Sequence, residues 1–250
     1  MTRNILEIKN LNISFGGVRA CNNSSLIVRQ GDIHAMIGPN GAGKTTLVSL
    51  LAGELQPDSG QILFDGDDIT DLPVHSKVAR GIARSYQITS LFESMTVLEN
   101  VVLATQRAAG IGFSMRLKTP GLEEVRAEAM DLLRDNLLDH LKDAAVRILS
   151  YGDKRTLEIC IALACQPEIL ILDEPMAGMG VEESQRIVDM LARLKGRYTI
   201  LLVEHDMDAV FRLADRITVL VQGMPIMTDD PEIVRADPHV RAAYLGEDEE

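Results

Sequence analysis

Residues 38 to 46 read Gly-Pro-Asn-Gly-Ala-Gly-Lys-Thr-Thr, between a strand-like run at 33–37 and a helix-like run at 47–51. Glycines at this spacing let the backbone wrap a triphosphate with its N–H groups pointing inward, and the loop ends at a helix N-terminus, which favours anions. Lys44 can reach the β and γ phosphates, and Thr45 can supply an oxygen to Mg²⁺. A glycine turn before an ordinary helix is the plainer alternative. The predicted nucleotide-binding residues here are Gly38, Pro39, Asn40, Gly41, Ala42, Gly43, Lys44, Thr45 and Thr46.

The composition limits the class of protein. With 250 residues, of which 46% are hydrophobic, the chain can bury one large α/β core and a smaller appended lobe. No uninterrupted apolar run approaches the ~18 residues that a membrane span requires. The formal net charge of −12 argues against broad attraction to nucleic acid or anionic lipid. The first four residues lack the apolar segment of a signal peptide, so we expect a cytosolic protein. Cys160 and Cys165 lie in an apolar helical stretch and are expected to be small core residues.

The hydrophobic pattern changes twice along the chain. Apolar and polar residues alternate from 5 to 37 and again at 61–66, which is typical of a half-buried antiparallel sheet. From about 95 to 165 apolar residues fall at helical spacing, and after 169 strands alternate with helices. The helical positions include Leu122, Val125, Ala129, Leu132 and Leu133, followed by Leu137 and Leu141.

These patterns predict an α/β fold in which a phosphate-loop nucleotide-binding core carries an antiparallel β subdomain and an inserted α-helical subdomain. The predicted limits within a single domain are 1–87 and 166–237 for the core with the β subdomain, 88–165 for the helical subdomain, and 238–250 for a C-terminal tail.

Acidic residues and a histidine follow two late strands. The apolar run 169–172 ends in Asp173 and Glu174, at the strand end where α/β sheets bind ligands. Asp173 is placed to support Mg²⁺, and Glu174 is placed to polarise the water that attacks the γ phosphate. His205 follows the strand at 200–203 and could donate a hydrogen bond to the γ phosphate. Two acids after a strand also start helices, and a strand-end histidine is often plain surface.

The segment Leu149-Ser150-Tyr151-Gly152-Asp153 precedes an amphipathic helix. Ser150 and Asp153 have capping-box spacing, so these residues could simply start that helix. The same geometry, a small hydroxyl and a glycine at a helix N-terminus, can form a second phosphate receptor. A site that has its own loop would need this receptor from another copy, which predicts a dimer with nucleotide at the interface.

The order of these motifs resembles the ATP-binding cassette (ABC) family over essentially the whole chain. The resemblance implies that Phe15 stacks on adenine and that Ser150 and Gly152 belong to the family's signature. It also implies the catalytic residues Glu174, His205 and Gln87 and the Mg²⁺ ligands Thr45, Gln87 and Asp173. ATP and Mg²⁺ are therefore the expected cofactors.

Finer features, at 81–87, 174–179 and 243–246, look like the ATPase subunits of branched-chain amino-acid importers. Two departures stand out. Tyr151 replaces the second glycine of the general signature, with Lys154 after it where glutamine or arginine is usual. Gly180-Val181 replaces the usual Asn-Pro or Asp-Pro of the loop that crosses between subunits.

The resemblance implies a peripheral protein at the cytoplasmic face of the cell (inner) membrane. Its expected partners are separate integral-membrane permease subunits, a second ATPase subunit (the same chain or a paralogue) and, indirectly, a solute-binding protein, but no nucleic acid. Two alternatives stay open: an ATPase of a lipid or lipopolysaccharide exporter, and a soluble ABC ATPase acting on ribosomes or DNA. A permease-docking groove is expected from residues of which at least two should be lobe core: Leu91, Phe92, Met95 and Leu98.

Overall fold

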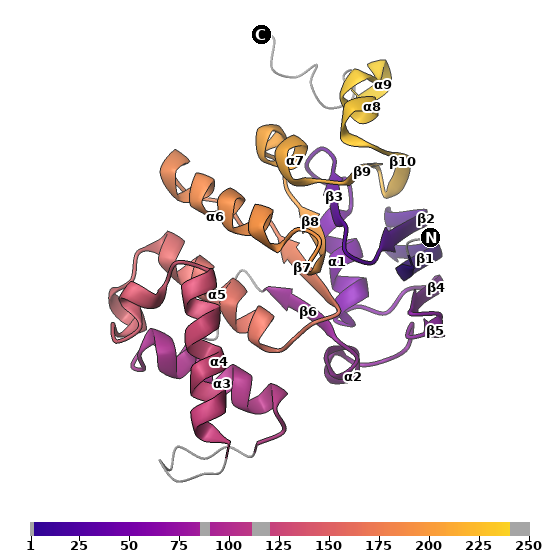
Figure 1. Cartoon of the computed structure of the whole chain (residues 1–250). Coiled ribbons are helices and arrows are strands. Elements are labelled where there is room, and N and C mark those ends of the chain that lie inside the picture. Colours follow the sequence, from indigo (N-terminus) through magenta and orange to yellow (C-terminus); the bar gives the residue numbers. More distant parts are fainter. Residues whose placement is uncertain (1–2, 86–90, 112–120, 241–250) are drawn as a thin grey trace. The chain divides into compact units, whose positions relative to one another are not determined.

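The computed structural model describes residues 3–85, 91–111 and 121–240 (Figure 1). Contacts divide the chain into two compact units. The first unit is Met1–Arg84, Glu168–Glu174 and Leu191–Glu250, and the second is Ser85–Pro167 and Pro175–Met190. The sequence pattern limits the helical part to 88–165, whereas the contacts group 175–190 with it as well. None of the helices described is both long and apolar enough to cross a membrane.

A six-stranded sheet in the order β10-β9-β3-β8-β7-β6 forms the centre of the first unit. β3 pairs in parallel with β8 and β9, β7 pairs in parallel with β8, and β10 runs antiparallel to β9. Every residue of β3, β7 and β8 is buried, as expected for parallel strands that are covered on both faces. The strands are β3 (Ile33–Ile37), β6 (Ile82–Ser85), β7 (Ile169–Asp173), β8 (Thr199–Val203), β9 (Arg216–Val221) and β10 (Met224–Asp229).

The first unit also contains a four-stranded antiparallel sheet in the order β2-β1-β4-β5. Its strands are β1 (Asn4–Phe15), β2 (Val18–Arg29), β4 (Ser59–Phe64) and β5 (Asp67–Asp68). Along β2, Leu26 and Val28 are buried while Ile27 and Arg29 are exposed. This alternation follows from the period of two in a strand, and it confirms the predicted half-buried antiparallel sheet for the residues of β1 and β2. The prediction is wrong for 33–37, because these residues form β3, which is buried throughout and pairs in parallel in the other sheet.

Two hydrophobic cores lie on opposite sides of β3 because successive side chains of a strand face opposite ways. Met36 belongs to the larger core, with the antiparallel sheet and α1 (Lys44–Ala52). Ala35 and Ile37 belong to the other core, with α7 (Met207–Leu213), α8 (Pro231–Ala236) and α9 (Pro238–Val240). The short α2 (Val74–Ala79) contacts α1.

The second unit is helical. It holds α3 (Val97–Ala108), α4 (Leu122–Asp135), η1 (Asp139–Leu141), η2 (Val146–Ile148), α5 (Tyr151–Ala164) and most of α6 (Val181–Leu194). α3 begins with a capping box between Thr96 and Glu99, and it packs against α4 and α5. Val125, Ala129 and Leu133 are the buried face of α4, which confirms the helical spacing predicted there.

Two expectations within this unit are wrong. Leu137 does not extend the apolar face of α4, because the helix ends at Asp135 and Leu137 is exposed with a positive φ of 59°. Cys165 is exposed because it caps the C-terminus of α5, whereas Cys160, inside the same helix, is buried.

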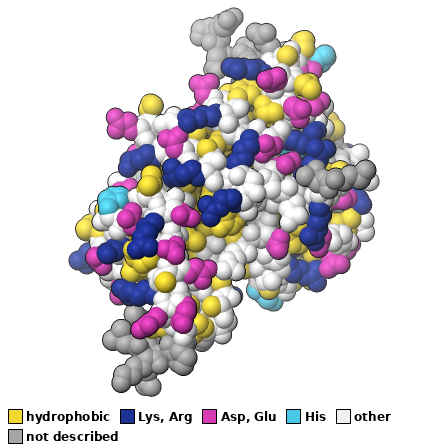
Figure 2. Space-filling model, viewed as in Figure 1, with side chains coloured by type: hydrophobic (Ala, Val, Ile, Leu, Met, Phe, Trp, Pro, Cys, Tyr) yellow, Lys and Arg dark blue, Asp and Glu magenta, His cyan; other side chains and the backbone are white. Residues whose placement is uncertain are grey.

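Charged side chains of both signs are interspersed over the visible face of the described residues (Figure 2).

Candidate nucleotide site

The glycine-rich loop connects β3 to α1, and its backbone packs closely against the backbone of β2 and β9. A Cβ atom on Gly43 would lie 2.2 Å from the backbone oxygen of Ala20, and one on Gly38 would lie 2.1 Å from that of Leu220. Gly43 also has a φ of 97°, which other residues rarely adopt. Larger residues at these two positions would therefore push the loop off the sheet. In the described residues no side chain caps the start of α1, whose N–H groups face the position predicted for phosphates.

Lys44 lies over this loop. Its Nζ donates to the carbonyl oxygens of Gly38, at 2.7 Å, and Pro39, at 3.2 Å. Burial lowers the pKa of Lys44, and the charges of Glu174 and Asp173 partly oppose that shift. The ammonium group is thus a partly desolvated cation beside a helix N-terminus, which fits a phosphate group. The helix that follows the loop, α1, also contacts β7.

The end of β7 delivers two carboxylates with different surroundings. The Asp173 side chain is only 2% exposed and forms an ion pair with Arg84. Glu174 is half-buried, and its backbone has a positive φ of 47°, held by an N–H donated to the carbonyl oxygen of Val203 at 2.9 Å. A non-glycine residue with such a φ carries local strain, which often accompanies functional sites.

The end of β8 carries His205 above a buried carboxylate. Glu204 is fully buried, and its Oε2 accepts the backbone N–H of His205 at 3.1 Å and lies 3.8 Å from the ring Nδ1. The His205 side chain is exposed, and Asp206 caps the start of α7 by accepting the N–H of Ala209. Glu204 therefore supports the backbone of the predicted histidine, a role that the sequence pattern did not single out.

The sheet topology brings these strand ends together. β8 lies between β3 and β7, and Val203 is paired with both Met36 and Asp173. All three strands run parallel, so the phosphate loop, the two acids and the histidine follow the same edge of one sheet. This is the edge at which open α/β sheets bind ligands.

The segment predicted to be a second phosphate receptor lies in the second unit and forms the capped N-terminus of α5. The Ser150 Oγ accepts the N–H of Asp153 at 3.1 Å and donates to its Oδ2 at 2.8 Å, which confirms the capping interpretation. Gly152 is buried, and its N–H donates to Oε1 of Glu183 on α6 at 3.3 Å. A Cβ on Gly152 would lie 2.8 Å from that oxygen, so a larger residue here would displace the Glu183 side chain. Glu183 is a second residue that the sequence pattern missed.

A family model for ABC transporters matches residues 21–177, more than half of the chain. This chain is an ABC transporter ATPase. A second model, for branched-chain amino-acid ATP-binding cassette transporters, matches residues 225–250.

Individual relatives agree with the family assignment. The high-affinity branched-chain amino acid transport ATP-binding protein LivG of Salmonella typhimurium is 41% identical over 255 residues, covering 99% of this chain and all of LivG. The lipopolysaccharide export system ATP-binding protein LptB of Escherichia coli is 35% identical, covering 97% of this chain and 98% of LptB. The crystal structure of the ADP conformation of MJ1267, an ATP-binding cassette of an ABC transporter, superposes with a TM-score of 0.84 at 32% identity, covering 98% of this chain and all of MJ1267.

These findings place the ABC transporter ATPase in the branched-chain amino-acid subfamily and confirm the predicted α/β fold. It binds ATP, hydrolyses it to drive transport, and works in a membrane-associated complex with permease subunits. Phe15, at the end of β1, is half exposed and available for stacking. Gln87 lies outside the described residues, so its two predicted roles stay predictions.

Proposed function

We propose that this ABC transporter ATPase powers uptake of leucine, isoleucine or valine through separate permease subunits. Its 41% identity to LivG over nearly the whole chain carries the proposal. The match at 225–250 supports it, because this segment is not part of the phosphate loop or of the strand ends beside it. Under this proposal the chain would act at the cytoplasmic face of the cell membrane, where the permease would connect it to an external solute-binding protein. Export of lipid or lipopolysaccharide is the second candidate, favoured by the 35% identity to LptB.

The geometry supports a division of roles at the sheet edge. Lys44 and the loop N–H groups would hold the phosphates, and half-buried Glu174 would be the general base for the attacking water. His205, exposed above Glu204, would contact the γ phosphate. Adenine would stack on Phe15.

Magnesium fits the donor set of this edge. Mg²⁺ prefers oxygen ligands and keeps several waters, so it needs few protein groups. The exposed hydroxyl-bearing Thr45 at the start of α1 and the Asp173 carboxylate are oxygen donors on neighbouring elements, and Gln87 is the third predicted ligand. When bound, the cation would offset the charge of the β and γ phosphates.

A second ATPase subunit, either another copy of this chain or a paralogue, would complete each site with its signature residues. Ser150 and Gly152 would contact the γ phosphate bound to the first subunit. The Gly152 N–H, however, donates to Glu183 in this structure. Because one N–H group points in one direction, the hydrogen bond from Gly152 to Glu183 would have to lengthen or break before Gly152 could donate to the γ phosphate. Val181, which the sequence assigns to the loop that crosses between subunits, is the exposed first residue of α6.

The expected permease contact centres on Phe92. This side chain is 54% exposed, whereas Leu98 is buried and Leu91 and Met95 are half-buried. The exposed ring lies next to a well-fixed backbone, because Phe92 exchanges hydrogen bonds with the side chain of Asn100. A large exposed aromatic on a rigid support suits a short permease helix.

Cargo is tested by deleting the gene and measuring ATP-dependent uptake of radiolabelled leucine, isoleucine and valine. We expect uptake of these amino acids to fall to background, to recover with the wild-type chain, and not to recover with Glu174→Gln. Uptake of a cationic amino acid serves as the control and should not change. If uptake of all three is unaffected while envelope lipid export fails, the exporter candidate replaces the importer.

A further inference from the structure

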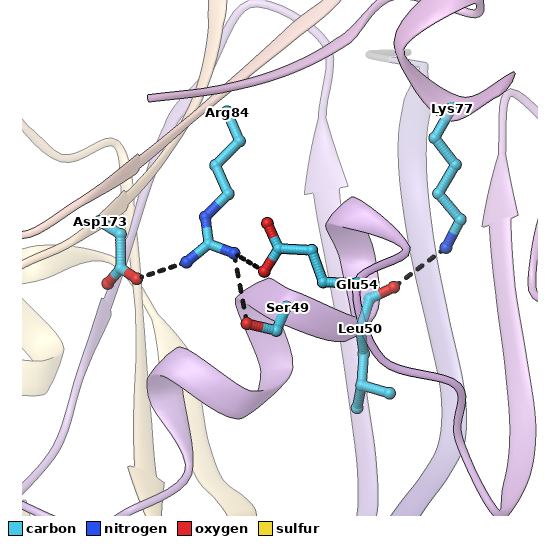
Figure 3. Close-up of polar contacts among 6 residues, drawn as sticks. All are labelled: Ser49, Leu50, Glu54, Lys77, Arg84 and Asp173. Carbon is cyan, nitrogen blue, oxygen red and sulfur yellow. Dashed lines mark hydrogen bonds and ion pairs between the residues drawn. The ribbon is translucent and has the colours of Figure 1, made fainter. Parts of the chain in front are cut away.

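The side chain of Arg84 joins three parts of the first unit. Its Nη2 donates to Oδ2 of Asp173 at 3.0 Å, and its Nη1 donates to Oε2 of Glu54 at 2.6 Å and to Oγ of Ser49 at 3.2 Å (Figure 3). Arg84 is on β6, Asp173 ends β7, and the other two residues lie on or just after α1. The guanidinium group therefore ties the end of β7 to helix α1.

This arrangement depends on the shape of arginine. The Arg84 side chain is 11% exposed and the Asp173 carboxylate 2%, so both charges are almost removed from water. Such a pair persists only when its geometry is good and further hydrogen bonds satisfy its remaining polar atoms. A planar guanidinium presents its donors in a fixed fork and can bind two carboxylates at once, whereas an ammonium group is a point charge without that fork.

Ser49, which Arg84 contacts on α1, lies on the same helix face as Thr45, a second predicted magnesium ligand. Ser49 follows Thr45 by four residues, so the two side chains lie on the same face of the helix, one turn apart. The C-terminal turn of α1 is itself fixed from another direction, because the buried Lys77 donates to the carbonyl oxygen of Leu50 at 3.0 Å (Figure 3). Arg84 thus holds the Asp173 carboxylate against a helix that cannot easily shift.

We propose that Arg84 is a positioning residue for the magnesium site, which sets the Asp173 carboxylate relative to the face of α1 that begins at Thr45. The inference rests on the proposed role of Asp173 as a magnesium ligand. Partners that orient metal ligands typically change metal affinity 10- to 100-fold when removed. Loss of the Arg84 fork should therefore weaken Mg²⁺ binding without removing any group that touches the nucleotide.

The experiment measures how the affinity for a fluorescent ATP analogue depends on Mg²⁺ concentration. For Arg84→Gln we expect the half-saturating Mg²⁺ concentration to rise about tenfold or more, while the affinity measured in EDTA changes less than about twofold. Arg84→Lys keeps the charge and should give a smaller rise. Arg80→Gln is the matched control, because Arg80 forms an exposed ion pair with Asp67 at 3.7 Å, and it should leave the Mg²⁺ requirement unchanged.

Two further variants, Asp173→Asn and Glu54→Gln, show whether a negative result concerns the magnesium site itself or only the role of Arg84. If Asp173→Asn leaves the Mg²⁺ requirement unchanged, the proposed magnesium site is wrong. If Asp173→Asn raises it but Arg84→Gln leaves it unchanged or lowers it, only the role of Arg84 is overturned. Glu54→Gln weakens the second arm of the fork and should raise the requirement by a smaller factor. Should Arg84→Gln fail to fold, an unchanged requirement in both Arg84→Lys and Glu54→Gln overturns the inference.

Discussion

Replacing Glu174 with glutamine should slow ATP hydrolysis by roughly two orders of magnitude or more, while ATP binding stays intact. Carboxylate and amide are nearly the same size, but only the carboxylate can act as an effective base. The strained backbone at Glu174 should tolerate the change, because the N–H to Val203 that holds it is not altered. Steady-state phosphate release from the variant assembled with its permease is the measurement, together with an ATP titration.

The control for this prediction is Glu232→Gln, an exposed acid in the first turn of α8. It should hydrolyse ATP at the wild-type rate. Turnover of Glu174→Gln close to that of this control would remove Glu174 from the catalytic role. Weak ATP binding by the variant would instead show that the carboxylate supports the nucleotide rather than the attacking water.

Replacing Lys44 with alanine should weaken ATP binding itself by roughly 10- to 100-fold, the effect of losing one charge-assisted hydrogen bond network. Lys44 is only 7% exposed, so its ammonium group is poorly solvated in the loop, and this burial lowers its pKa. A poorly solvated cation interacts more strongly with phosphate than an exposed one does. Calorimetric titration with ATP and Mg²⁺ gives the dissociation constant directly.

Lys9→Ala is the matched control, because the Lys9 side chain is half exposed and pairs with Glu7 at the surface. Its ATP affinity should equal that of the wild type. An unchanged ATP affinity in Lys44→Ala would contradict the phosphate-loop assignment. Thermal unfolding of both variants shows whether either change simply loosens the loop.

A candidate nucleotide site can be recognised from the local patterns because each motif is contiguous and its physics is local. The loop 38–46 needs glycines, a cation and a helix start, and all three are visible in nine consecutive residues. Apolar runs that end before Asp173 and before Glu204-His205 indicate buried parallel strands, and the carboxyl ends of such strands share one edge. The order of the strands in the sheet had to come from the structure.

Contacts between distant segments could not be predicted in this way. Arg84 and Asp173 are separated by 89 positions, and neither residue type at that separation indicates a pair. The contact between Glu183 and Gly152 depends on how closely α6 approaches the start of α5. The burial of Glu204 was hidden because an acid after an apolar strand is usually exposed. Leu137 misled the helical pattern because periodicity alone does not show where a helix ends.

The central claim is that each ATP is held by one subunit's loop and the other subunit's signature. Two differently tagged copies of this chain, both carrying Glu174→Gln, can be assembled with the permease and the trapped ATP counted per complex. With Lys44→Ala on one copy and Ser150→Arg on the other, both changes fall in the same shared site, so we predict one trapped ATP. With both changes on the same copy each site is damaged, and we predict none. The opposite result, no trapped ATP in the first arrangement and one in the second, would show that each subunit binds ATP alone and would contradict the account.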